Sequence, residues 1–208
     1  MHLYRARVLE GVALSELGRF AEATVAHVEG WSLARVMDDV QREIWAIGNL
    51  GALCFGMGQW SAAIRYFEKA RSMAEEYGFA DLEFHSRTNL ADCAVQLRDP
   101  VGGLAALSQF RTETPETRPQ MSVSANGLNT LSRLHLLAGN LDAARIHAEE
   151  SSRLARTARL EKIAPNSEAV LALIDVFSGA VDKGFPVLER ALLFAKQKSQ
   201  IELPDYLG

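Results

Sequence analysis

Cysteine is scarce in this sequence of 208 residues. Only Cys54 and Cys93 occur, and each lies on an apolar segment. A disulfide-based scaffold needs many more thiols, so we expect packing roles for both in a reducing compartment, the cytoplasm. Because the two lie almost one repeat apart, a disulfide between them is the open alternative.

An excess of basic charge and long apolar runs are also lacking. The 22 basic residues are outnumbered by 26 acidic ones, which gives a net charge of -4. No nucleic-acid partner or anionic membrane surface is therefore expected. Charged or polar residues interrupt every apolar stretch before about 18 residues, so no transmembrane helix is predicted. Met1 leads directly into a charged, helix-like segment without a signal-peptide core.

Motifs of catalysis and metal binding are missing as well. The sequence has no Walker motif, no paired-cysteine motif and no nucleophile elbow. The five histidines, His2, His27, His85, His135 and His147, do not have metal-ligand spacing. His27 and His135 lie on apolar faces, where we expect hydrogen-bonded core histidines. The sequence therefore predicts no enzyme, no metal site and no cofactor.

What the sequence does contain is a turn that returns at an almost constant interval. Steps of 40, 40, 41 and 40 residues separate the second residues of the turns, which are Gly18, Gly58, Arg98, Gly139 and Gly179. Small residues follow five positions later, at Ala23, Ala63, Gly103, Ala144 and Gly184. Others precede by seven, at Gly11, Gly51, Ala91, Ser132 and Ala172. A long fixed period with small residues in phase predicts stacked helix pairs.

Each period indicates two helices joined at the turn. The repeats cover about 1–38, 39–79, 80–118, 119–160 and 161–200. The predicted helices are 2–17, 20–35, 39–57, 60–77, 80–97, 100–110, 120–138, 141–159, 165–178 and 181–198. Small residues let the paired helices approach closely, so Gly51 is expected to face Ala63.

Two regions depart from the regular pattern. Pro115 and Pro119 shorten the second helix of the third repeat, which predicts a notch or a tolerated loop variation. The segment 201–208 falls where a sixth pair would begin, and neither end has an obvious polar capping face. We expect one solenoid domain over 1–208 that is a piece of a longer chain.

The phased residues resemble the tetratricopeptide repeat (TPR). The second repeat matches its consensus best, with Leu50, Gly51, Gly58, Ala63, Phe67 and Ala70. The resemblance implies an all-α, right-handed alpha-alpha superhelical solenoid of about five helix-turn-helix repeats. The usual period is about 34 residues. Longer repeats such as these resemble those of bacterial regulators fused to a diguanylate cyclase or a DNA-binding module.

The resemblance also implies a binding surface, because the first helix of each pair lines the concave face in this family. The positions carried over that we take as ligand-binding are Trp45, Asn49, His85, Asn89, Asn126, Asn129 and Arg133. Asn49 and Asn89 are one period apart, and Asn129 follows 40 residues later, one position early in its repeat. Amides both donate and accept hydrogen bonds, so this ladder suits a peptide backbone.

Alternative roles stay open for these residues. The amides can instead cap or bridge neighbouring helices. Trp45 can belong to the core, and His85 and Arg133 can be solvated or salt-bridged instead of contacting a carboxylate. The sequence predicts a protein-interaction scaffold that binds a peptide or protein partner, with a self-associating, homodimeric architectural module as the alternative.

Overall fold

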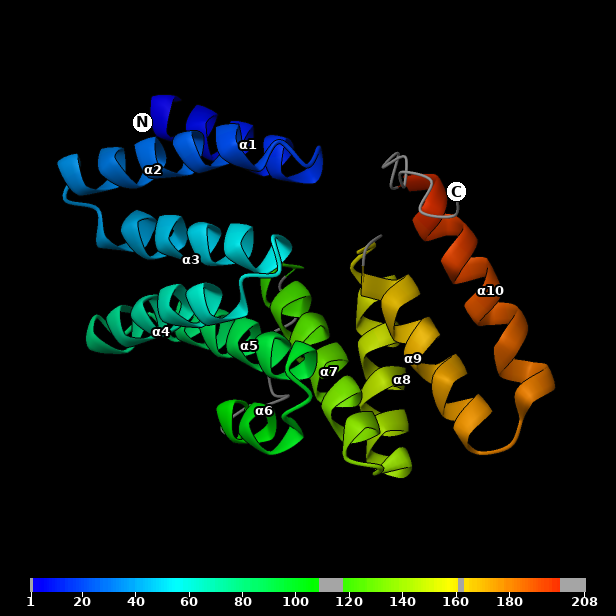
Figure 1. Cartoon of the computed structure of the whole chain (residues 1–208). Coiled ribbons are helices and arrows are strands. Elements are labelled where there is room, and N and C mark those ends of the chain that lie inside the picture. The colour runs from blue at the N-terminus through cyan, green and yellow to red at the C-terminus, as the bar shows by residue number, and fades with distance from the viewer. Residues whose placement is uncertain (1, 109–117, 161–162, 199–208) are drawn as a thin grey trace. The chain divides into compact units, whose positions relative to one another are not determined.

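The computed structural model describes residues 2–108, 118–160 and 163–198, which form ten α-helices and no strand (Figure 1). In chain order the helices are α1 (His2–Glu16), α2 (Phe20–Val36), α3 (Val40–Gly56), α4 (Trp60–Glu76), α5 (Ala80–Gln96), α6 (Pro100–Ala106), α7 (Arg118–Leu137), α8 (Leu141–Thr157), α9 (Ile163–Phe177) and α10 (Val181–Lys198). The predicted all-α class of paired helices is confirmed. Of the helices in these ranges, none combines the length and apolar character that crossing a bilayer requires.

Helix boundaries agree with the predicted ones to within two residues, except at the end of α6. That helix stops at Ala106 instead of residue 110. Two of its seven residues are glycines, Gly102 and Gly103. Each glycine destabilises a helix by about 1 kcal/mol relative to alanine, which favours a short helix. The predicted notch after it falls on residues 109–117, which lie outside the described part of the chain.

Glycines with a left-handed backbone end many of the helices. Gly18, Gly58, Gly78, Gly139 and Gly179 have φ between 71° and 89°. The peptide N–H of Gly18 donates to the carbonyl of Ser15 (3.1 Å), and that of Arg19 donates to Leu14 (2.9 Å). This pair of bonds is the Schellman motif, which satisfies the last carbonyls of a helix.

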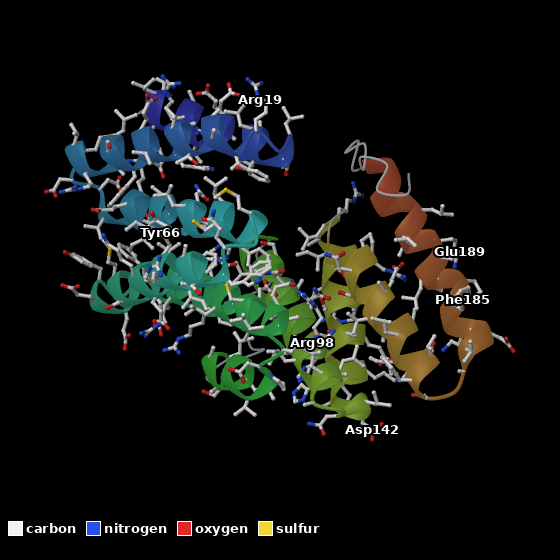
Figure 2. All side chains as sticks on the ribbon, viewed as in Figure 1. Arg19, Tyr66, Arg98, Asp142, Phe185 and Glu189 are labelled. Atoms are coloured by element: carbon white, nitrogen blue, oxygen red, sulfur yellow. The ribbon has the colours of Figure 1, made fainter. Side chains whose placement is uncertain are left out.

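The same motif also joins one repeat to the next. Asp38 (φ 51°) and Arg159 (φ 56°) hold the equivalent position between repeats, and Arg98 (φ 55°) holds it between α5 and α6 (Figure 2). Positions 18, 38, 58, 78 and 98 are therefore 20 residues apart. The structural period is one helix and one turn, which is half of the period seen in the sequence.

Within the described residues, the side chains of Asp39 and Asp99 cap the starts of α3 and α6. The carboxylate of Asp39 accepts from the peptide N–H of Arg42 (3.0 Å) and that of Asp99 from the N–H of Gly102 (2.9 Å). Asp39 also pairs with the guanidinium of Arg42. Aspartate is among the preferred capping residues, because its oxygen satisfies a peptide N–H that has no partner within the helix.

The chain divides into two compact units, residues 1–123 and 124–208, and the boundary falls within α7. In the first unit, Ile44, Ile47 and Leu82 pack against Ala70 and Ala74. In the second, Val170 and Ile174 of α9 pack against Ala144 and Ala148 of α8. In both units, alanines of the second helix of a pair therefore pack against the first helix of the following pair. The single-domain interpretation stays a prediction.

Small residues permit close approach, and the side chain nearest to Gly51 is that of Phe67. The atoms nearest to a Cβ built on Gly51 belong to the ring of Phe67, with Cε1 at 2.5 Å, and not to Ala63. Side chains of a helix lean toward its N-terminus, so the Phe67 ring lies over the turn that begins at Ala63. The ring of His27 packs on Gly11 in the same way, because a Cβ atom at position 11 would lie only 2.6 Å from His27 Cε1.

Both cysteines are buried and free, so the alternative of a disulfide is not found. They lie in one apolar cluster with Ala63 and Phe67, as the packing prediction requires. Burial, reinforced by the negative charge of Asp92, raises the pKa of the Cys93 thiol to about 12. Burial raises the pKa of Cys54 too, and Arg65 opposes the shift.

A polar network holds the helices of the second unit together. Asp175 on α9 pairs with Arg145 of α8 (2.7 Å) and with Lys183 of α10 (2.8 Å). The side-chain hydrogen bonds from Lys183 and Arg145 lower the pKa of Asp175. One carboxylate therefore links three successive helices, and its ionised form is favoured because both partners are cations.

Candidate functional site

The most concentrated set of predicted binding residues lies in a pocket of the first unit. The pocket has a volume of about 440 Å³ and is formed by the first two turns of α3 and α5 and by residues near the start of α7. Its lining residues are Gln41, Trp45, Gly78, Phe79, Ala80, Asp81, Leu82, His85, Ser122 and Val123. This volume is in the range of small-ligand sites.

Trp45 and His85 are the two predicted site residues within this pocket. They lie 40 residues apart, at the same position of successive repeats, and their ring centroids are separated by 5.1 Å at an interplanar angle of 46°. The Trp45 side chain is 40% exposed, although α3 is otherwise well packed. Trp45 is therefore a partly exposed wall of the pocket, not a core residue.

The electrostatics of the pocket are simple. Burial lowers the pKa of His85, because the charged imidazolium would lose its hydration, so the ring is neutral at pH 7. Of the lining residues that the structure describes, Asp81 is the one with a formal charge at that pH. Phe79, Leu82 and Val123 supply apolar walls. The pocket thus combines aromatic and aliphatic surface with a single carboxylate.

Asn49 and Asn89 extend the face that Trp45 and His85 begin. Each lies four residues later on the same helix, and residues at that spacing share one helix face. Both are half-buried. Neither makes a side-chain hydrogen bond within the part of the chain that the structure describes. The first unit therefore brings four of the seven predicted residues to one polar and aromatic face.

Asn129 does not continue this ladder. It is only 4% exposed, and its Oδ1 accepts a 3.4 Å hydrogen bond from the Ser167 hydroxyl of α9. A one-residue offset rotates a side chain by about 100° around the helix, and here it turns the amide into the packing between helices. Asn129 thus has the bridging geometry weighed as an alternative to ligand contact.

A serine pair completes this buried bridge. Ser151 Oγ of α8 lies 2.8 Å from Ser167 Oγ and donates a 2.6 Å hydrogen bond to the Ala125 carbonyl. Asn126 and Arg133, the remaining predicted residues, are half-buried in the second unit. A ligand role for these two stays a prediction.

The histidines expected in the core are buried but are not hydrogen-bonded as predicted. His27 is 3% exposed and His135 half-buried, and the Nδ1 atoms of both are buried without a partner among the described residues. Burial lowers the pKa of each ring. The prediction failed because the His27 ring packs on Gly11 and the His135 ring on another imidazole, and neither arrangement offers Nδ1 a partner.

One pairing was missed by sequence reasoning. The rings of His135 and His147 stack at 5.3 Å across the turn between α7 and α8. The positions of the two histidines in the sequence could have predicted this contact, because they lie on either side of the tight turn at Gly139. Within the described ranges, no group of three or more histidine, cysteine or acidic side chains is placed to hold a metal ion.

Comparison with known proteins rests on structure alone. No protein-family model matches the chain, and no curated protein matches it. A variant of a kinesin-light-chain-like protein from Podosopora anserina, with nearly identical TPR-like repeats, superposes with a TM-score of 0.62 over 96% of this chain and 99% of that one, at 14% identity. The chain folds as a tetratricopeptide-like repeat protein.

Two further structures support the TPR-like fold. BtubC (BKLC) from P. vanneervenii has a TM-score of 0.61 and 17% identity, covering 90% of this chain and 77% of that one. A second structure of the Podosopora anserina protein gives 0.56 at 13% identity, over 94% and 96% of the two chains. At such identities the likeness describes the fold, and the functional argument depends on the pocket.

Proposed function

We propose that this TPR-like chain is a protein-interaction scaffold that binds an extended peptide segment of a partner protein across α3 and α5. The observation that supports it is the pocket, where Trp45 and His85 meet at equivalent positions of two repeats. A side chain of the partner enters the pocket, and the rest of the segment continues over the adjacent helix face.

The amides on that face supply the backbone recognition. A peptide in extended conformation presents both N–H and C=O groups along its length. The side chains of Asn49 and Asn89 can donate to one and accept from the other. Their lack of a partner within the described residues makes them available for this role.

The finer role proposed is that of a regulatory segment in a bacterial signalling protein, such as a diguanylate cyclase or a transcriptional regulator. It is supported by the likeness of the long repeats to those of such regulators. Two free, buried thiols suit the cytoplasm as its location. The test is co-purification of the native protein from cells: an attached or bound output domain supports the role, and its absence contradicts it.

The binding site is tested with peptides selected from a displayed random library against the wild-type chain. We expect two variants to bind the selected peptides less tightly: the double variant Asn49→Ala/Asn89→Ala and the single variant Trp45→Ala. Each should raise the Kd by at least about tenfold, which is about 1.4 kcal/mol. Tyr77→Ala, an exposed aromatic residue outside the pocket lining, is the matched control. Equal binding by the control and the site variants would overturn the proposal.

Self-association is the second candidate function, and exposed apolar side chains favour it. Leu9 and Leu17 of the first repeat, and Phe185 and Leu192 of α10, are each more than half exposed. Exposed apolar surface is costly unless a partner covers it. Light scattering over a concentration series tests this function: a dimer that Leu9→Glu or Phe185→Glu dissociates supports it, and a monomer at every concentration contradicts it.

A further inference from the structure

We propose that the pocket at Trp45 receives a cationic side chain, an arginine or a lysine, of the partner segment. The inference rests on the proposed function and names the residue class that anchors the peptide. Three features of the first unit support it: the charge of the lining, the free face of Trp45, and apolar walls that suit an aliphatic stem.

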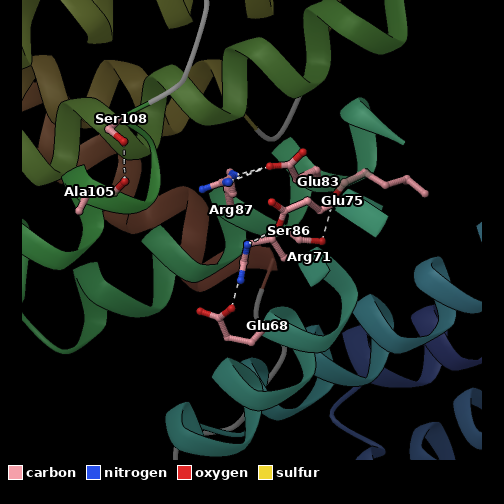
Figure 3. A network of polar contacts seen from close by, with 9 residues as sticks. Glu68, Arg71, Glu75, Glu83, Ser86, Arg87, Ala105 and Ser108 are labelled. Atoms are coloured by element: carbon pink, nitrogen blue, oxygen red, sulfur yellow. Dashed lines mark hydrogen bonds and ion pairs between the residues drawn. The ribbon is translucent and has the colours of Figure 1, made fainter. Parts of the chain in front are cut away.

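Among the lining residues that the structure describes, Asp81 carries a negative charge and none carries a positive one. Asp81 lies exposed in the first turn of α5 and makes no ion pair with any described residue. The neighbouring carboxylate Glu83 is occupied, because it accepts from Arg87 at 2.8 Å (Figure 3). On α4, Arg71 likewise pairs with Glu68 and Glu75. Asp81 is thus a carboxylate left for a cation from another molecule.

His85 does not oppose this charge. Its burial favours the neutral ring, so no described lining residue is a cation that would repel a guanidinium or an ammonium group. A neutral imidazole also keeps one ring nitrogen as a hydrogen-bond acceptor. An acidic side chain would meet the opposite situation, since it would face Asp81 with no basic lining residue to compensate.

Trp45 offers an aromatic face to the same space. Indole is the strongest of the protein side chains in attracting a cation to its ring face. This chain already uses that interaction twice on Trp31, where Lys69 Nζ lies 4.9 Å and the Arg35 guanidinium 5.9 Å from the ring centroid. Among the described residues, no cation of the chain itself covers Trp45, whose ring contact is with His85.

The apolar lining accommodates the rest of a long basic side chain. Arginine and lysine carry methylene stems that pack on apolar surface while the charged head reaches a polar group. Phe79, Leu82 and Val123 form such a surface, and Asp81 provides the polar group. A purely apolar side chain would fill the same walls but would leave the carboxylate without a partner.

The experiment uses small probes and the indole N–H resonance of Trp45, which is assigned by comparison with a Trp45→Phe variant. Nα-acetyl-arginine amide is titrated into the 15N-labelled chain, in parallel with Nα-acetyl-citrulline amide, which has nearly the same shape but no charge, and with Nα-acetyl-glutamine and Nα-acetyl-glutamate amides. The arginine probe should shift the Trp45 signal with an affinity at least about fivefold above that of citrulline, and glutamate should bind least.

Two variants locate the charge effect. Asp81→Asn should reduce the affinity for the arginine probe by about fivefold and remove its advantage over citrulline. Glu76→Gln, the same loss of one exposed acidic charge at the end of α4, should leave both affinities unchanged. Equal binding of arginine and citrulline, or preference for glutamate, would overturn the inference.

The outcome for the inference is separable from that for the proposed function. Library-selected peptides that bind through Trp45 but contain no basic residue would support the proposed scaffold function and contradict the cationic anchor. Arginine binding that Asp81→Asn does not weaken would also remove it. Loss of the scaffold itself would require selected peptides that bind Trp45→Ala as tightly as wild type.

Discussion

In each of the first two repeats, an aromatic ring of the second helix packs against a glycine of the first helix. Gly11 meets His27, and Gly51 meets Phe67, with the same 16-residue separation. The phase of the small residues predicted close approach, but sequence periodicity does not specify which partner fills the space. That depends on side-chain direction, which leans the ring over the preceding turn.

Gly51→Ala should therefore destabilise the first unit by about 1–3 kcal/mol, because the added methyl group would overlap the buried ring of Phe67. Gly48→Ala is the matched control, since a Cβ there meets nothing within 4 Å. It should stabilise α3 by about 0.5–1 kcal/mol. Urea denaturation measures both, and destabilisation of equal size at the two sites would contradict this packing.

His27 makes the first repeat sensitive to acid. Its pKa is lowered in the folded state, so the unfolded chain binds more protons below the ordinary pKa of about 6.5, and stability is lost as the pH falls through that value. The slope is at most about 1.4 kcal/mol per pH unit for each proton. His85, His135 and His147 shift in the same direction and add to it.

The variant His27→Phe tests this contribution, because phenylalanine already fills the equivalent position at Phe67. The urea concentration at the unfolding midpoint of the wild type should decrease as the pH is lowered from 7 to 5. The variant should lose less stability over that interval. An unchanged pH dependence in the variant would show that the His27 ring is not the titrating group.

Cys93 should be inert to alkylation in the native state. A thiol with a pKa near 12 has almost no thiolate at neutral pH, and its side chain is inaccessible. Iodoacetamide should modify it only as fast as the chain unfolds, whereas urea should expose both cysteines to rapid labelling. Mass spectrometry of the labelled peptides measures the rates, and rapid native modification at Cys93 would contradict the burial.

At the scale of elements, the turn determines the architecture. The 40-residue markers predicted the helix boundaries because Gly18, Gly58, Gly139 and Gly179 occupy left-handed positions. The 20-residue structural period was hidden, since Asp38 and Arg159 hold the same geometry between repeats. Aspartate and arginine do not mark a turn as glycine does, although the backbone hydrogen bonds follow the same pattern.

Replacing a strained turn residue should stabilise the chain. Arg98 has φ of 55°, a conformation that costs a non-glycine residue about 1–2 kcal/mol, while glycine adopts it freely at an entropic cost of about 0.5–1 kcal/mol. Arg98→Gly should gain about 0.5–1 kcal/mol net. Gly58→Ala should lose stability at the equivalent turn. Thermal unfolding measures both, and a destabilised Arg98→Gly would contradict the strain.

At the scale of the whole molecule, the sequence predicted the repeats but only part of the site. Trp45, His85, Asn49 and Asn89 share a face because they are in register with the turns. Asn129 is one residue out of register with Asn49 and Asn89, so its side chain is buried and contacts Ser167. The pocket itself was not predictable, since its lining includes Asp81 and Val123, which only the packed structure places beside Trp45.

The proposed partner segment binds at the first two turns of α3 and α5. The most direct measurement is a chemical-shift map of the full chain on addition of a library-selected peptide. We predict that the largest changes lie at Trp45, Asp81 and His85 and extend to Asn49 and Asn89. Changes confined to α2 and α4, or to residues 124–198, would contradict binding at this site.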